Sequence, residues 1–398
     1  MDLKEDKTIS EVRTNLALDI EMAKDEGKKV VGLMCSYFPV EMVLAADAIP
    51  VGLCGTTEEP ISAAEEVLPA DQCPMVKATY GRAVGNTCPL FPLADCIIGE
   101  TTCDGRKKMY ELLAREKPMH VMDLPQKPEE KEAQEHWTAE VRKLKLFIEE
   151  QLDTVITEEN LKRAIRQVNT TRALLTEIHR CRKHHPVPIM GLDLVGLTTA
   201  SGYCVDRNDY TKRLTVLLEE LKRRIREKEF ACSPDRPRIL WTGLGNSLGC
   251  DKVLKLVEDC GGVVVCQEGC GGITRLEDPV DEAKDPIQAL AERYLRVTCS
   301  CMTPNTQRFK DIDRLITQYQ IDGVIDLTWQ FCHTFNIESY RVGELVKEKH
   351  GLPFLHIVTD FSQSDVGQLR VRIEGFLEQI TLGRRDESYG CTQAWEGL

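Results

Sequence analysis

A cysteine at the predicted start of a helix is the most reactive group that this sequence places in a defined position. Cys103 stands between an apolar run at 94–100, which predicts a buried strand, and a helical pattern that begins at Asp104. The free N–H groups and the dipole of a helix N-terminus favour the thiolate form, which can bind a metal or attack an electrophile. A lone half-buried cysteine is more often structural, so the other cysteines decide how Cys103 is interpreted.

Other cysteines of the first half occupy comparable positions. They are Cys35 after a strand predicted at 30–34, Cys54 after a strand at 49–53, and Cys73 beside Pro74 at a helix start, with Asp71 as candidate N-cap. In open parallel sheets, ligands bind outside the carboxyl ends of the strands. We therefore expect these thiols and Cys103 at one edge of a sheet, whereas Cys88 and Cys96 are predicted to lie elsewhere.

The second half repeats this arrangement. Cys270 lies on a glycine-rich loop after a strand predicted at 262–266, Cys299 and Cys301 precede a helix that ends near residue 319, and Cys332 follows a strand at 322–327. A helix is then predicted to begin near residue 337. If the ligand-binding edges of the two sheets face each other, these thiols line one cleft.

The elements that position the cysteines alternate between strand and helix in both halves, which predicts an α/β fold. A chain of 398 residues also exceeds what one ordinary core can organise. We expect two parallel-sheet domains and a helical connecting region. The predicted limits are 1–145 for the N-terminal α/β domain, 146–233 for the helical region, 234–385 for the C-terminal α/β domain and 386–398 for a tail.

The composition restricts the compartment and the partners. Hydrophobic residues make up 42% and charged residues 29%, and no apolar run reaches the roughly 20 residues that a membrane helix needs. The first residues lack the apolar segment of a secretory signal, which predicts a cytoplasmic protein. The formal net charge of −13 provides no basic stripe for nucleic acid.

The number of cysteines indicates metal or redox chemistry. In a reducing compartment, 17 cysteines serve these purposes more often than disulfides. The sequence contains no C-x-x-C pair, which argues against zinc ribbons, thioredoxin-like sites and ferredoxin-type runs. An iron–sulfur cluster can use dispersed thiolates and is the leading hypothesis, with a zinc site and plain core cysteines as alternatives.

Several longer motifs carry a resemblance that extends over nearly the whole chain. They are CSYFPVE (35–41), LP (68–69), CPMVK (73–77), ETTCDG (100–105), KKMY (107–110), CSCMTPN (299–305), CHT (332–334), ES (338–339), TDFS (359–362) and DVGQL (365–369). With them the sequence resembles the 2-hydroxyacyl-CoA dehydratase superfamily, and within it most closely the double-cubane-cluster reductases. It departs from the pattern at GLG (243–245), where relatives often carry a cysteine and a proline after the glycine.

The resemblance implies two Rossmann-like domains around an iron–sulfur site, a homodimer, and electrons from a separate ATP-hydrolysing iron–sulfur activator. It assigns Cys73, Cys103 and Cys332 to a [4Fe-4S] cluster. A double-cubane [8Fe-9S] cluster needs further ligands, for which the position at the sheet edges suggests Cys35, Cys270 and one of Cys299 or Cys301. A cluster held from both halves would help to keep them together.

The leading functional hypothesis is an ATP-dependent reductase of small molecules with a double-cubane cluster. One alternative is a subunit of a [4Fe-4S] 2-hydroxyacyl-CoA dehydratase, and another is a non-enzymatic electron-storage or scaffold protein. The sequence has no P-loop, so a partner would hydrolyse ATP. His333 and, less strongly, Glu41 are candidate proton donors, and a structural hydrogen-bonding role is the competing interpretation of both.

Overall fold

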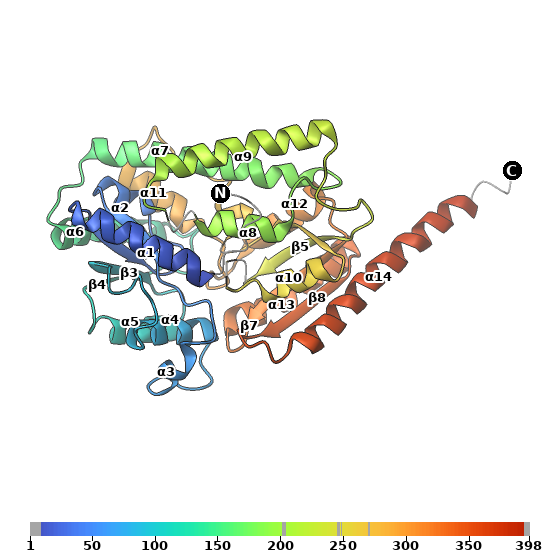
Figure 1. Cartoon of the computed structure of the whole chain (residues 1–398), viewed down its shortest axis with the longest axis horizontal. Helices are drawn as coiled ribbons and strands as arrows, with labels where there is room; N and C mark the ends of the chain where they lie inside the picture. Colours follow the sequence, from blue (N-terminus) through green and yellow to red (C-terminus); the bar gives the residue numbers. More distant parts are fainter. Residues whose placement is uncertain (1–8, 201–203, 245–246, 248, 270, 394–398) are drawn as a thin grey trace.

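The computed structural model describes residues 9–200, 204–244, 247, 249–269 and 271–393 of the chain (Figure 1). Two four-stranded sheets, in which all strands are parallel, form the frame of the molecule. The predicted α/β class with two Rossmann-like sheets is therefore confirmed.

The first sheet has the order β2-β1-β3-β4. Its strands are β1 (Val30–Leu33), β2 (Ile49–Gly52), β3 (Cys96–Glu100) and β4 (Met119–Met122). The second sheet has the matching order β6-β5-β7-β8. Its strands are β5 (Arg238–Gly243), β6 (Val263–Gln267), β7 (Gly323–Trp329) and β8 (Phe354–Thr359). The central strands β1, β3, β5 and β7 are buried throughout, as expected of parallel strands covered on both faces.

Alternating side chains of the first sheet enter two apolar cores. Val31 and Leu33 point into a core with α2 (Val40–Ala45), α6 (Lys131–Leu152) and α11 (Pro286–Leu295). On the opposite face, Val30 and Ile97 pack with helices α1 (Ile9–Asp25), α4 (Pro74–Val84) and α5 (Asp104–Leu113). The short helix α3 (Ile61–Glu65) lies beside α4.

The second sheet is covered in the same way. One face packs with helices α10 (Lys252–Asp259) and α14 (Val366–Gln393). The other packs with α12 (Thr306–Gln318), α13 (His333–Glu344) and the π-helical segment η3 (Leu345–Lys349). Single 3-10 turns, η1 (Cys181–Lys183) and η2 (Ile273–Arg275), occur in the connections.

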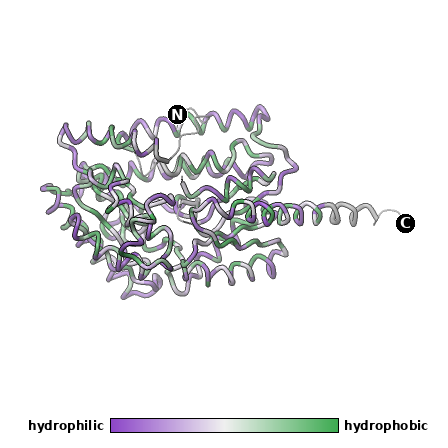
Figure 2. Tube along the Cα trace, turned by 60° about the horizontal axis from the view of Figure 1, so that its bottom comes forward, coloured by the Kyte–Doolittle hydropathy of each residue, from purple (hydrophilic) through white to green (hydrophobic). Residues whose placement is uncertain are grey.

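A layer of long helices joins the two sheets. Helices α7 (Glu158–Arg180) and α9 (Arg207–Glu227) run side by side along the top of Figure 1 and share a core with α8 (Gly191–Ala200). Helix α14 instead leaves the body towards the C-terminus, and its hydrophobic stretch lies where it packs on the second sheet (Figure 2). No helix in the described ranges is both long and apolar enough to span a bilayer.

The apolar cores do not follow the predicted domain limits, which remain predictions. Residues from Val280 to Met302, including α11, share the core of the first sheet although they follow β5 and β6 in the chain. Helical backbone also continues to Gln393, within the segment predicted as a tail.

Two local predictions need correction. Helix α13 begins at His333 rather than near residue 337, because nothing in residues 333–336 breaks a helix and the carbonyl of Cys332 accepts from the amide of Asn336. The N-cap of α4 is Cys73 rather than Asp71, because Pro74 itself occupies the first helical position, where proline is favoured.

Candidate functional site

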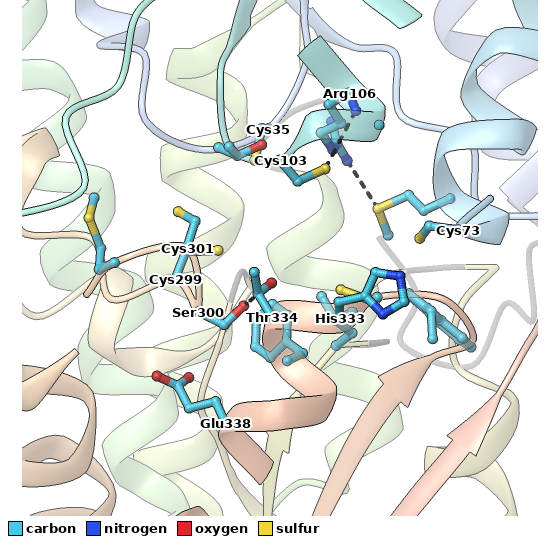
Figure 3. A pocket seen from close by; sticks show the side chains of 18 of the residues that line it. Cys35, Cys73, Cys103, Arg106, Cys299, Ser300, Cys301, His333, Thr334 and Glu338 are labelled. Carbon is cyan, nitrogen blue, oxygen red and sulfur yellow. Dashed lines mark hydrogen bonds between the residues drawn. The ribbon is translucent and has the colours of Figure 1, made fainter. Parts of the chain in front are cut away.

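A cavity of about 1610 Å³ lies between the ligand-binding edges of the two sheets. Its described lining includes thiols from both halves of the chain: Cys35, Cys54, Cys73, Cys103, Cys299, Cys301 and Cys332. Figure 3 shows the labelled cysteines around one common space. Cys88 and Cys96 are buried in the cores and do not line it.

The sheet topology explains why these thiols meet. In the first sheet β1 and β3 are neighbours, and the connections that follow them run in opposite directions, to β2 and to β4. This creates a topological switch point, the position where open α/β sheets bind ligands. Cys35 follows β1 and Cys103 follows β3, and Cys332 follows β7 at the equivalent place in the second sheet.

Three of the cavity thiols stand at helix N-termini. Cys73, Cys103 and Cys332 are the N-cap residues of α4, α5 and α13. The Sγ of Cys103 accepts a hydrogen bond from the backbone N–H of Arg106 at 3.5 Å. Helix starts at Cys73 and Cys103 were predicted and are confirmed, and each directs free amides and a positive dipole end towards the cavity.

Burial and mutual repulsion oppose the ionisation of these thiols without a counter-charge. Burial, followed by the nearby Cys73, raises the pKa of Cys332 to about 12, with smaller contributions from Cys299 and Cys103. Burial also raises the pKa of Cys73, although the amides of Met75 and Val76 act in the opposite direction. A cationic group that reaches several thiolates at once would relieve both effects.

Cys299 and Cys301 lie on one loop that Tyr37 holds against the first sheet. The Tyr37 hydroxyl donates to the carbonyl of Val297 at 2.7 Å and lies 3.7 Å from Cys301 Sγ. It also accepts from the amide of Cys299 at 3.4 Å. The adjacent Cys301 thiol and burial raise the pKa of Cys299 well above its usual value.

Polar contacts connect the same loop to α13. Asn305 Nδ2 donates to the carbonyl of Cys299 and to Glu338 Oε1, both at 3.0 Å. Ser300 Oγ donates to Thr334 Oγ1 at 2.8 Å (Figure 3). The loop with Cys299 and the helix that begins after Cys332 are therefore fixed relative to each other.

The backbone beside two cavity residues is strained. Cys35 has a φ of 80° and Phe331, directly before Cys332, has a φ of 63°. Non-glycine residues rarely adopt this left-handed conformation, and such strain concentrates at functional sites. Both sharp turns occur directly beyond a strand of the switch points.

The structure separates the two proton-donor candidates. His333 is exposed, is the first residue of α13 and lines the cavity. Glu41 is fully buried outside the lining, where its carboxylate pairs with Arg172 at 2.8 Å and accepts from the Tyr294 hydroxyl at 2.7 Å. The predicted ligand Cys270 lies outside the described residues.

Sequence reasoning missed Arg106. Its guanidinium is buried on the cavity wall and donates to Cys54 Sγ at 3.7 Å and to Met75 Sδ at 3.1 Å. The signal was present in the sequence, because a basic residue in the first turn of a helix opposes the dipole and needs a local reason.

The donor set fits a large, multi-metal group better than a single ion. Within the described part of the chain, no three His, Cys, Asp or Glu side chains converge as ligands of one metal ion. The thiols surround the cavity from several sides instead. This arrangement suits a cluster whose different metal atoms each reach different thiols.

Comparison with known proteins agrees with the resemblance found in the sequence. Residues 35–380 match the family described as 2-hydroxyglutaryl-CoA dehydratase, D-component. The chain is 37% identical to YjiM of Escherichia coli (strain K12), provisionally named a dehydratase subunit, over 93% of this chain and 96% of that protein.

More distant relatives have named substrates. Identity is 24% to the (R)-phenyllactyl-CoA dehydratase beta subunit of Clostridium sporogenes, over 89% of this chain and 92% of the relative. It is 20% to one of the benzoyl-CoA reductase subunits of Thauera aromatica, over 90% and 92%. The fold, the cavity and these matches together establish that the chain belongs to the 2-hydroxyglutaryl-CoA dehydratase D-component family.

Proposed function

We propose that this protein is a low-potential iron–sulfur reductase of small molecules that holds a double-cubane [8Fe-9S] cluster between its two sheets. The observation that supports this most directly is the convergence of Cys35, Cys103 and Cys332 from both switch points on one cavity. A bound iron–sulfur cluster supplies electrons, at a potential that the surrounding protein tunes.

The thiols fall into two neighbourhoods that match two halves of such a cluster. Cys73, Cys103 and Cys299 all act electrostatically on Cys332, and we assign Cys73, Cys103 and Cys332 to one cubane. Cys35, Cys299 and Cys301 act together on Tyr37. We assign Cys35, Cys270 and one cysteine of this loop to the other cubane.

Of the two loop cysteines, we favour Cys299 as the ligand. Its side chain is partly exposed and contacts the cores of both sheets. Cys301 is buried in the first core, with its thiol directed to the Tyr37 hydroxyl. Comparing the iron content of Cys299→Ser and Cys301→Ser tests the choice, and an equal loss in both would contradict it.

The remaining cavity residues act on substrate and protons. We propose that the His333 ring donates a proton to the reduced substrate, because it is exposed and lies beside Cys332. Glu41 is not part of this proposal, since its carboxylate is engaged by Arg172 and Tyr294. His333→Gln should keep the iron, slow substrate reduction and change its pH profile.

The electron donor is a separate protein in this proposal. The sequence contains no P-loop, and an ATP-hydrolysing iron–sulfur activator would deliver the electrons to a homodimer in the cytoplasm. Several relatives are named as subunits, which accords with a protein that acts together with partners.

A second candidate function is a subunit of a [4Fe-4S] 2-hydroxyacyl-CoA dehydratase. The family description and the dehydratase names of several relatives favour it. A non-enzymatic electron-storage or scaffold role is the third, and it predicts that an activator transfers electrons without any turnover of substrate.

Metal analysis of protein purified without oxygen distinguishes these functions. We expect about eight irons per chain for the double-cubane reductase, whereas about four would indicate the dehydratase subunit. Iron-free protein after anaerobic purification and reconstitution would refute both. ATP-dependent reduction of the cluster by a purified activator then tests the assigned electron route.

A further inference from the structure

Arg106 is a buried cation in the wall of the thiol cavity. It stands in the first turn of α5, and its backbone N–H already donates to Cys103 Sγ. Both terminal nitrogens lie 3.7 Å from Cys54 Sγ, and Nη1 also donates to the Tyr110 hydroxyl at 3.4 Å. Figure 3 shows its side chain beside the labelled cysteines of the first half.

Other buried arginines of this protein have carboxylate partners, and Arg106 does not. Arg172 pairs with Glu41, and Arg308 pairs with Glu268. Among the described residues, no carboxylate oxygen lies within ion-pair distance of Arg106. Glu100 acts on Arg106 only through space, because its Oε1 accepts from the amides of Tyr37 and Phe38.

A buried guanidinium without a carboxylate is costly unless another negative charge is near. Burial alone would lower the pKa of Arg106, yet the adjacent Cys54, Tyr110, Cys35 and Cys103 together raise it. In the described ranges, the polar partners of its side chain are sulfur atoms and one tyrosine hydroxyl. Its compensation therefore depends on negative charge in the cavity.

We propose that Arg106 is the fixed counter-charge of the anionic cluster and raises its reduction potential. The inference rests on the proposed function. A one-electron reduction adds a negative charge to the cluster, and a nearby cation stabilises the reduced form more than the oxidised form. Arg106 is thus a positioning residue that acts through charge and not on the substrate.

The same geometry explains why Cys54 is not assigned as a ligand. Its sulfur lines the cavity but is held by both terminal nitrogens of Arg106. Cys54 is therefore a site where the charge of Arg106 can be cancelled without removing Arg106 itself.

The first test compares Arg106→Met, which keeps most of the volume, with Arg106→Lys, which keeps the charge. Each holoenzyme is purified without oxygen, its iron is measured, and the cluster is titrated with Ti(III) citrate while the reduced signal is followed by electron paramagnetic resonance. We expect Arg106→Met to shift the midpoint potential to more negative values and Arg106→Lys to retain the wild-type value. Iron loss in Arg106→Met alone would also support the counter-charge.

A role in packing alone predicts different results. The inference is overturned if Arg106→Met keeps both its iron and its potential, or if both variants lose iron to the same extent. A wild-type protein without iron would instead refute the proposed function, and this inference would fall with it.

A second pair of variants leaves Arg106 in place. Cys54→Asp puts a carboxylate beside the guanidinium, and Cys54→Asn is the neutral control of the same shape. We expect a more negative midpoint potential, or loss of iron, only in Cys54→Asp. Equal behaviour of the two variants would contradict the counter-charge.

Discussion

At the scale of single residues, position relative to the sheet edge separates cysteines that otherwise look alike. Cys103 caps a helix beside the cavity, whereas Cys88 is buried in the core of α1, α4 and α5. Only the first is placed where a thiolate could reach a shared metal group.

Cys103→Ser should lose iron, and Cys88→Ser should keep it. We expect Cys88→Ser to cost about 1–3 kcal/mol in stability, because a hydroxyl replaces a buried thiol in an apolar core. Iron analysis and urea unfolding, both without oxygen, check the pair. Full iron in Cys103→Ser would remove it from the ligand set.

A buried histidine predicts how stability depends on pH. Burial, together with the neighbouring Arg182, lowers the pKa of His179 to about 3 from its ordinary value of 6.5. Between these values the unfolded chain binds a proton that the folded chain excludes, so stability falls as the pH drops below 6.5. At pH 5.5 the loss from this group is about 1.4 kcal/mol.

The variant His179→Gln has no such proton to exclude. Its stability relative to wild type should therefore rise as the pH falls from 7.5 to 5.5, measured by urea unfolding at each pH. Parallel pH curves for the two proteins would show that His179 is not the acid-sensitive group.

At the scale of elements, a buried polar network connects three helices. Glu41 of α2, Arg172 of α7 and Tyr294 of α11 contact one another, and Arg172 Nη2 donates to the Tyr294 hydroxyl at 2.7 Å. The network fixes α11, and with it the start of the cysteine loop, to the first half of the chain.

Glu41→Gln should destabilise the fold by about 3 kcal/mol, because it leaves the Arg172 charge buried without its carboxylate. The matched control is Glu158→Gln in α7, whose exposed pair with Lys162 should contribute less than about 1 kcal/mol. Urea unfolding measures both. We also expect unchanged turnover per iron in Glu41→Gln, and a selective loss of turnover would restore Glu41 as a catalytic candidate.

At the scale of the whole molecule, apolar contacts hold the two halves together independently of any metal. Helix α11 and the residues up to Met302 belong to the core of the first sheet. A cluster between Cys103 and Cys332 would add a connection at the cavity, and its binding energy would add to the stability of the folded state.

Removal of the iron should therefore loosen the cavity without separating the halves. We expect faster hydrogen exchange at the first turns of α5 and α13, lower stability by several kcal/mol, and a nearly constant radius in small-angle scattering. A clear increase in radius would show that the shared core is too weak to keep the halves closed.

The sequence by itself determined the alternation of strands and helices and the positions of cysteines at strand ends and helix starts. These features depend on residues close together in the chain, as at Cys73, where Pro74 marks the first helical position. The α/β class and the separation of Cys103 from Cys88 could be predicted for the same reason.

Only the tertiary structure decided which side chains meet. The pair of Glu41 and Arg172, the contact of Arg106 with Cys54 and the place of α11 in the first core join residues far apart in sequence. Such contacts depend on how the sheets and helices pack, and no local pattern encodes them. For this reason Glu41 looked like a site residue in the sequence, and Arg106 did not.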